Sequence, residues 1–333
     1  MDCKRLNRYC ALRQLFSIVC IMAMMSCTWV KDERDDCPEG FWLKLNYTYN
    51  LLDIEAAQKY VTDASVYIFD ADGKFAKSMY VNHTQLINNG YRIRVEDLPE
   101  GDYQFVVWSG IDDEFYRVTD EGNIIDNFRL SLIPTGLHNN FAGELPDLFH
   151  GYLAKIHYDN SYAVHQVNLT KDTNILSCLV VSVNNEAVMN SNDYSMVIQC
   201  DNATMDAYNN LVETVNVTYE PNQSGSVTFN DDNYGLVKGI QFRIPTLRLI
   251  TDKDNRIALS KKADGVKLFD ISLSEYIGTM GTLYTINNTY SVQEYLDRQD
   301  FFTVVFYLSD DLERLIDLKV DTWRMRTNNH LNI

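Results

Sequence analysis

Residues 65–81 read SVYIFDADGKFAKSMYV, and this stretch decides the fold that we predict. The segment 65–69 is rich in strand formers, DADG at 70–73 is a turn sequence, and the chain then returns through 74–81. Together these segments predict a β-hairpin. A second strand signal precedes it, because apolar residues alternate with polar ones at Leu43, Leu45, Tyr47 and Tyr49.

Short strand-like segments separated by turn residues continue along the rest of the chain. In the first half we expect them at 91–95 and 103–108, whereas residues 133–160 are less regular. In the second half we expect strands at 175–183, 195–200, 215–219, 226–230, 239–243, 247–250, 267–273, 301–308 and 315–323. Many short strands joined by turns predict an all-β protein made of β-sandwiches.

The length of 333 residues suits two such domains, since it is too long for one ordinary sandwich and too short for three. The strand pattern resumes near residue 165 after the irregular region. We therefore predict an N-terminal sandwich at 38–165 and a C-terminal sandwich at 166–333. Helices are expected to be few, at 51–61 and after Ser291, where Ser-x-x-Glu has the spacing of a capping box.

The first 26 residues are predicted to be a targeting signal. Four basic residues precede the apolar run LFSIVCIMAMM at 15–25, which is too short to span a bilayer comfortably. The following Ser26-Cys27 resembles a bacterial lipobox, so we predict cleavage before Cys27 and diacylation of Cys27. The alternative is a non-lipidated secretory signal in which Cys27 is incidental.

Residues 27–37 are predicted to be an acidic tether, because KDERDD stands at 31–36. The run resembles the export signal of Bacteroidetes lipoproteins that are displayed on the outer face, although a plain flexible spacer would read the same way. Removal of residues 1–26 takes away four basic residues and one acidic residue, which leaves a net charge of about −20. Such a surface repels nucleic acid and anionic headgroups, so membrane attachment must come from lipid.

Three cysteines remain after cleavage and lipidation, namely Cys37, Cys178 and Cys200. In an oxidising envelope a disulfide is permitted, and we expect Cys178 with Cys200. A hairpin that pairs Val183 with Ser195 would set these two cysteines opposite each other. The alternative is a pair of buried free thiols that behave as small apolar side chains.

No arrangement of residues in the sequence suits catalysis or a cofactor. The six histidines have no metal-ligand spacing, and neither His-Glu-x-x-His nor Gly-x-Ser-x-Gly occurs. His150 and His157 are interpreted as a packed or solvated pair. DADG at 70–73 and NDDN at 230–233 are interpreted as turns, not as calcium loops, because neither continues to the terminal glutamate of an EF-hand. We predict a non-enzyme without cofactor or metal.

Several segments together resemble the FimB-type fimbrial anchor (minor fimbrium subunit) lipoprotein family of Bacteroidales. The matching pieces follow one another along nearly the whole mature chain: Asp36-Cys37-Pro38, 43–49, 66–70 with Asp72-Gly73, 98–103, 145–151, 167–171 and 301–308 before Trp323. The resemblance implies two transthyretin-like β-sandwich domains, a lipid anchor at Cys27 in the outer membrane, and a role in type V pili, whose subunits join by donor-strand exchange. It implies other fimbrial subunits as partners and no catalytic residues.

The alternative function is that of a surface glycan-binding outer-membrane lipoprotein, since such proteins also present sandwiches with exposed aromatic residues. The sequence contains no obvious aromatic platform for a sugar, and core packing is the usual role of tryptophan.

A strand at 315–323 is the candidate for strand exchange. Its residues Ile316, Leu318 and Val320 are expected on one face. They would either seat in the groove of a partner subunit or complete the chain's own second sandwich.

Overall fold

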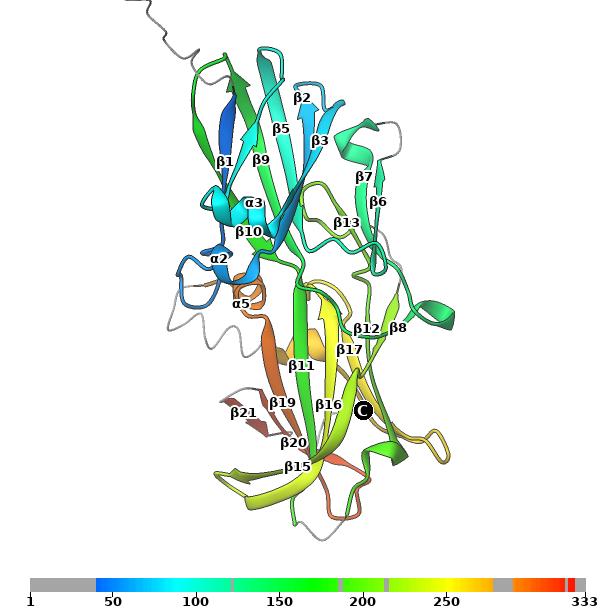
Figure 1. Ribbon diagram of the computed structural model, residues 1–333. Coiled ribbons are helices and arrows are strands. Elements are labelled where there is room, and N and C mark those ends of the chain that lie inside the picture. The colour runs from blue at the N-terminus through cyan, green and yellow to red at the C-terminus, as the bar shows by residue number, and fades with distance from the viewer. Residues whose placement is uncertain are drawn as a thin grey trace, which may run out of the picture.

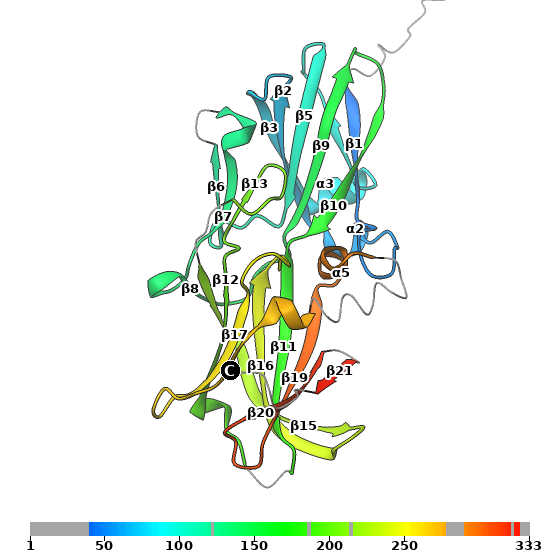
Figure 2. The same cartoon turned by 180° about the vertical axis from the view of Figure 1, so that it is seen from behind.

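The computed structural model describes residues 40–120, 123–184, 188–212, 216–277, 290–320 and 323–326. These residues form an elongated molecule with one half above the other in Figure 1, and Figure 2 shows the same stack from behind. The upper half holds a seven-stranded sheet, and the lower half holds a six-stranded and a five-stranded sheet. The prediction of an all-β fold with sandwich architecture is confirmed.

The seven-stranded sheet encloses the apolar core of the upper half. Its strands in spatial order are β3 (Phe75–Asn82), β2 (Asp63–Asp70), β5 (Gly101–Ser109), β9 (Phe149–Tyr158), β10 (Val164–Lys171), β1 (Phe41–Asn46) and β4 (Arg92–Val95). The β1 residues Leu43 and Leu45 point into the core, as their alternation predicted.

The hairpin predicted at residues 65–81 is confirmed as β2 and β3, which pair antiparallel. One carboxylate oxygen, Asp70 Oδ1, accepts hydrogen bonds from the backbone N–H groups of Asp72 and Lys74, each at 2.9 Å. Gly73 adopts a φ of +76°, a left-handed conformation that glycine takes without a steric penalty. The DADG sequence therefore acts as a turn.

Two sheets pack face to face in the lower half (Figure 1). The six-stranded sheet has the order β15 (Gln223–Asp231), β16 (Gly235–Leu247), β11 (Thr173–Ser182), β19 (Phe301–Leu308), β20 (Leu315–Val320) and β21 (Trp323–Arg326). The five-stranded sheet has the order β18 (Lys267–Ser272), β17 (Arg256–Lys261), β12 (Tyr194–Cys200), β14 (Val217–Glu220) and β8 (Asn140–Ala142).

Short strands cross between the halves and interlock them. The upper half supplies β8, which pairs parallel with β14, and the lower half supplies β13 (Thr204–Asp206), which pairs with β7 (Phe128–Leu132). A three-stranded sheet of β13, β7 and β6 (Tyr116–Asp120) results at the side of the upper half. One apolar cluster consequently runs from Trp108 in the upper half to Leu176 in the lower half without a break.

Helices are short, as expected. Among the described residues they include α2 (Ala57–Tyr60), α3 (His83–Asn88) and α5 (Val292–Arg298), with single 3₁₀ turns η3 (Ile125–Asn127), η4 (Leu137–Asn139) and η5 (Ser191–Asp193), and residues 273–277 are also helical. The predicted start at Ser291 is confirmed, because its side chain accepts the N–H of Glu294 at 3.1 Å. Only the end of the helix expected at 51–61 forms, as α2.

A ten-residue strand, β9, lies in the region that the sequence pattern left irregular. The pairing of β9 with β5 shifts register between Tyr103 and Phe105, and Lys155 has a φ of 35°. This is a β-bulge, which inserts an extra residue and reverses the alternation of apolar and polar side chains halfway along the strand. The sequence of β9 therefore lacks the continuous alternation of apolar and polar residues that would have predicted a strand.

The chain passes from the upper half to the lower half through β10 and β11, which are separated only by Asp172. The predicted boundary after residue 165 falls near the start of β10, whereas the change of sheet comes after Lys171. The division into two domains stays a prediction.

Buried charges surround this crossing. The ammonium of Lys171, whose side chain is only 7% exposed, lies 2.8 Å from a carboxylate oxygen of Asp147 and 2.6 Å from one of Asp300. The next residue, Asp172, is fully buried and accepts a hydrogen bond from Asn209 Nδ2 at 2.9 Å. Arg248 donates to the backbone carbonyl of Asn209 at 3.0 Å.

Arg248 also pairs with Asp297 of α5 through two hydrogen bonds of 2.7 Å each. Such bidentate pairs are among the strong and geometrically specific interactions in proteins. The crossing, the β13 loop, the end of β16 and α5 are thereby tied into one network.

The first prediction concerns Gly151 in the centre of the upper sheet. A Cβ there would lie 2.5 Å from Val167 Cγ1 and 2.9 Å from Leu169 Cδ2, so Gly151→Ala should overpack the core. We expect a loss of about 1–3 kcal/mol in the free energy of unfolding, measured by chemical denaturation. Gly225→Ala on β15 is the matched control, because no atom lies within 4 Å of its added Cβ. Equal stability of the two variants would contradict this packing.

The second prediction concerns pH. Burial raises the pKa of Asp172 to about 7, whereas an unfolded aspartate titrates near 3.9. Between roughly pH 4 and 7 the folded state holds the extra proton, so the stability that this residue contributes at low pH is lost as pH rises. We therefore expect the free energy of unfolding of Asp172→Asn, measured relative to that of wild type, to increase by on the order of 2–4 kcal/mol between pH 5 and pH 8.

The exposed Asp252→Asn is the control and should leave that pH profile unchanged. If Asp172→Asn and wild type have parallel profiles from pH 5 to pH 8, the assignment of the buried proton is wrong.

Candidate subunit-binding site

Among the described residues, no group of three His, Cys, Asp or Glu side chains is arranged to hold a metal ion. The two histidines that the sequence paired have separate structural roles. His150 is buried against Trp108, with ring centroids 4.5 Å apart, and its Nε2 lies 2.9 Å from the Ala207 carbonyl oxygen. Burial lowers the pKa of His150 to about 4, so the ring is neutral at physiological pH. His157 is exposed and bonds Asp102 at 2.8 Å.

The acidic turn at residues 230–233 also serves the fold. Asp231 Oδ1 accepts the N–H groups of Asn233 and Tyr234 at 2.9 and 3.1 Å, and Asp231 Oδ2 accepts the Tyr307 hydroxyl at 2.5 Å. Both carboxylate oxygens are therefore used within the protein, which agrees with the interpretation as a turn.

The hairpin that was expected to pair Cys178 with Cys200 is wrong. Cys178 lies on β11, whose neighbours are β16 and β19, and Cys200 lies on β12, whose neighbours are β14 and β17. The two strands belong to facing sheets, and both cysteines are free and fully buried. Burial raises the pKa of each thiol far above its usual value. The alternative of two buried free thiols describes the structure.

The strand proposed for exchange completes the chain's own sheet. β20 lies between β19 and β21, and Leu318 and Val320 are buried in the core of the lower half. Ile316 does not share their face, because a register shift opposite Tyr307 and Leu308 turns it toward a separate apolar cluster on the other side of the sheet. The second of the two roles considered for this strand fits its position.

The predicted lipidation site, Cys27, and the tether with Cys37 lie outside the described residues. Within those residues no helix has the length and apolar character needed to cross a bilayer.

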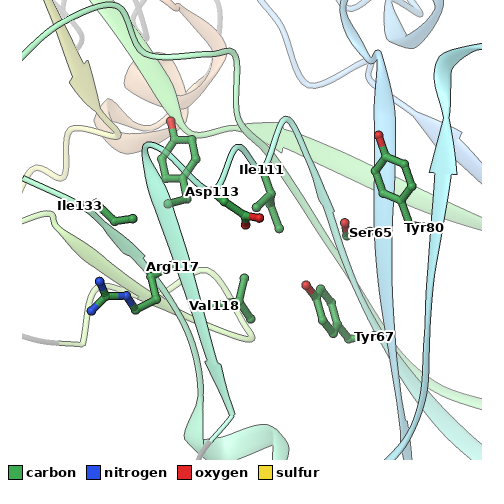
Figure 3. A pocket seen from close by; sticks show the side chains of 9 residues that line it. Ser65, Tyr67, Tyr80, Ile111, Asp113, Arg117, Val118 and Ile133 are labelled. Atoms are coloured by element: carbon green, nitrogen blue, oxygen red, sulfur yellow. The ribbon is translucent and has the colours of Figure 1, made fainter.

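A trough of about 610 Å³ lies between the β2–β3 hairpin and β6 (Figure 3). Its lining is contributed by β2, β3, β6 and two loops: Ser65, Tyr67, Tyr80, Ile111, Asp113, Tyr116, Arg117, Val118 and Ile133. Figure 3 shows Ser65, Tyr67 and Tyr80 on the hairpin side, facing Val118 across the trough. The volume is in the range of protein binding sites.

The β2–β3 hairpin forms one wall of the trough. The register of its two strands and the packing beneath them fix the positions of its side chains. Ser65 and Tyr80 are directly opposite each other across β2 and β3, so both side chains stand on the same outer face. The Tyr67 ring packs on Phe128 of β7, with centroids 4.7 Å apart. Tyr80 is 63% exposed at the rim.

The loop between β5 and β6 closes one end of the trough. Gly110 begins it with a φ of +85° and donates its N–H to Asp63 at 2.8 Å. The carbonyl of Asp112 then accepts the N–H groups of Phe115 and Tyr116 at 2.9 and 2.8 Å. These bonds hold Asp113 exposed at the mouth of the trough, where no described side chain forms an ion pair with it.

The sequence interpretation missed β6 and β7 and therefore the trough. A signal was present, since Phe128, Leu130 and Leu132 alternate with Arg129 and Ser131. The pattern identifies strands but does not say which strand lies at an edge.

The family model for Fimbrillin-A associated anchor proteins Mfa1 and Mfa2 matches residues 34–329. The chain therefore belongs to this family, and the resemblance to a fimbrial anchor family is confirmed. A comparison with curated proteins found no match.

Solved structures with the same fold come from Bacteroides and Porphyromonas species. A candidate adhesin from Bacteroides thetaiotaomicron is 26% identical with a TM-score of 0.76, covering 88% of this chain and 99% of its own. A candidate polysaccharide-binding protein from the same species is 25% identical with a TM-score of 0.74, covering 87% and 98%. The fimbrial anchor protein Mfa2 from Porphyromonas gingivalis, 15% identical with a TM-score of 0.66, covers 88% and 100% and shares the fold.

The third prediction is that Cys178 and Cys200 are both reduced in the native protein. Because both are fully buried, they should resist alkylation in the folded state and react after denaturation without reductant. Peptide mapping by mass spectrometry measures this, with a pre-reduced sample as the control. A peptide that joins Cys178 to Cys200 by a disulfide is the contrary result.

Proposed function

We propose that the protein is a structural, non-catalytic anchor or accessory subunit of type V pili. In this role it is tethered to the outer membrane through lipid on Cys27, displayed on the cell surface, and joined to other fimbrial subunits by strand addition. The observation that carries the proposal is membership of the anchor family over residues 34–329.

The direction of the first strand supports a tether at one end of the molecule. β1 runs parallel to β10, and β10 leads into the lower half. β1 therefore starts at the end of the upper half that is remote from the lower half (Figure 1). A lipid on Cys27 would hold that end at the membrane, and two acyl chains suffice for stable attachment.

The described residues also favour assembly over catalysis. Asp172, whose pKa burial raises to about 7, lies at the crossing between the halves, hydrogen-bonds Asn209 and does not line the trough. Among the described residues, each sheet ends in strands that pair on one side only, and proteins either protect such edges or use them for association.

The alternative function, surface glycan binding, has one observation in its favour, the likeness to the candidate polysaccharide-binding protein. Retention on immobilised polysaccharide, compared with co-purification with a fimbrial shaft subunit, separates the two.

The fourth prediction tests the anchor role by deletion and complementation. Deletion of the gene should release fimbriae into the medium, and Cys27→Ala should release both the protein and the fimbriae, because the acidic surface of the chain repels anionic headgroups and the proposed attachment is the lipid. Cys37→Ala, a second cysteine in the same tether, should restore firm attachment. The measurement is the ratio of fimbrial protein in medium and cells.

Firmly attached fimbriae in the deletion strain would contradict the anchor role. A Cys27→Ala protein that stays in the membrane with the same N-terminus, determined by mass spectrometry, would sink the lipid tether alone.

A further inference from the structure

The strand β6 presents an open edge to the trough. Among the described strands it pairs only with β7, and it contributes Tyr116, Arg117 and Val118 to the trough lining. An unpaired strand edge is a template for an added strand.

Hydrogen bonding identifies the backbone groups that point outward from this edge. The N–H of Ile133 donates to the Phe115 carbonyl at 2.8 Å, and in the register of β6 with β7 these two residues are opposite each other. Because hydrogen-bonded pairs alternate in an antiparallel ladder, Arg117 with Ser131 is the next such pair, and Val118 with Leu130 is not.

The far side of β7 agrees with this alternation. The N–H of Leu132 donates to Ala203 at 2.8 Å, away from β6. The N–H and C=O of Val118 therefore both point away from β7. The N–H of Tyr116 is already bonded to the Asp112 carbonyl at 2.8 Å, so Val118, in the middle of β6, is the trough-lining residue whose N–H and C=O both point outward, and Asp120 at the end of the strand has the same orientation.

We propose that the trough binds an extended segment of another fimbrial subunit, which adds to β6 as the fourth strand of the three-stranded sheet. This inference rests on the proposed function and names the surface where strand addition occurs. One residue of the added strand exchanges two hydrogen bonds with Val118, and alternate side chains of that strand pack on Ser65 and Tyr67.

Charge at the mouth of the trough limits the sequence of the segment. Asp112, Asp113 and Glu114 are exposed there, and Arg117 is the one basic residue in the lining. A lysine or arginine in the added segment, placed beside Asp113, complements this acidic end.

The trough suits a peptide strand better than a sugar, because the Tyr67 ring already packs on Phe128 and leaves only Tyr80 as a widely exposed ring. Another edge of the upper half is guarded. Next to β3, Lys77 bonds the Glu96 carbonyl at 2.9 Å and pairs with Asp97 at 3.5 Å, and charged side chains of this kind block edge pairing.

The fifth prediction uses two substitutions in complemented deletion strains, with their own fimbriae as the probe. Val118→Pro removes the outward N–H without removing a hydrogen bond to β7, and Ser65→Trp adds a large side chain to the hairpin wall of the trough. Each should raise the ratio of shed to attached fimbriae about tenfold at equal surface levels of the protein, because that ratio follows the dissociation constant. A tenfold change corresponds to about 1.4 kcal/mol.

Each of the two substitutions has a matched control. Val118→Thr retains the N–H, and Ser78→Trp puts the same bulk on the same face of the β2–β3 hairpin but outside the trough. Both controls should behave as wild type.

A photo-cross-linking residue at position 65, with position 78 as control, tests the site even if a variant fails to fold. Linkage from 65 to a segment of a fimbrial subunit is the expected result. Linkage to a glycan or to a second copy of this chain, or no linkage, overturns the proposal. If deletion releases fimbriae while Val118→Pro and Ser65→Trp hold them as wild type does, the β6 site is wrong and the anchor role stands.

Discussion

The passage of the chain from one half to the other through buried charges is the constraint on which the rest of the molecule depends. Lys171 ends β10, and Asp172 is the single residue between β10 and β11. The Lys171 ammonium pairs with the carboxylates of Asp147 and Asp300, and the buried Asp172 carboxyl accepts a hydrogen bond from Asn209. Removing one partner of a buried charged pair is costly, because the other is left without compensation. The crossing thus fixes how the two sheet systems continue into each other.

The strands that cross between the two halves of the chain reinforce this constraint. β8 and β13 each leave their own half to extend a sheet beside the other, and the apolar cluster is continuous across the junction. A subunit that carries mechanical load along its length benefits from such interlocking, because separation would break ladder hydrogen bonds and expose core together. The same crossing of β13 builds the three-stranded sheet whose outer strand is β6, so the architecture that joins the halves also creates the trough.

Local signals in the sequence were sufficient for the hairpin at 65–81, the strand at 301–308 and the cap at Ser291, because each depends on residues close in the chain. Two features that depend on distant pairing were not predictable. Adjacent strands in sequence were assumed to form a hairpin around Cys178, but β11 instead pairs with segments more than fifty residues away. β9 was not predicted because its bulge interrupts the alternation of apolar and polar residues. The trough was hidden for a related reason, since an edge is defined by all the pairings of a sheet.

The central claim is that this chain anchors a fimbria at the cell surface. The most direct measurement is a cryo-electron microscopy reconstruction of the cell-proximal end of native fimbriae. If this chain is the anchor, it should stand at the base, with β1 toward the membrane and a strand of the next subunit beside Val118 of β6. A base that lacks this chain, or a reconstruction that finds it at the distal tip, would show that it is not the anchor.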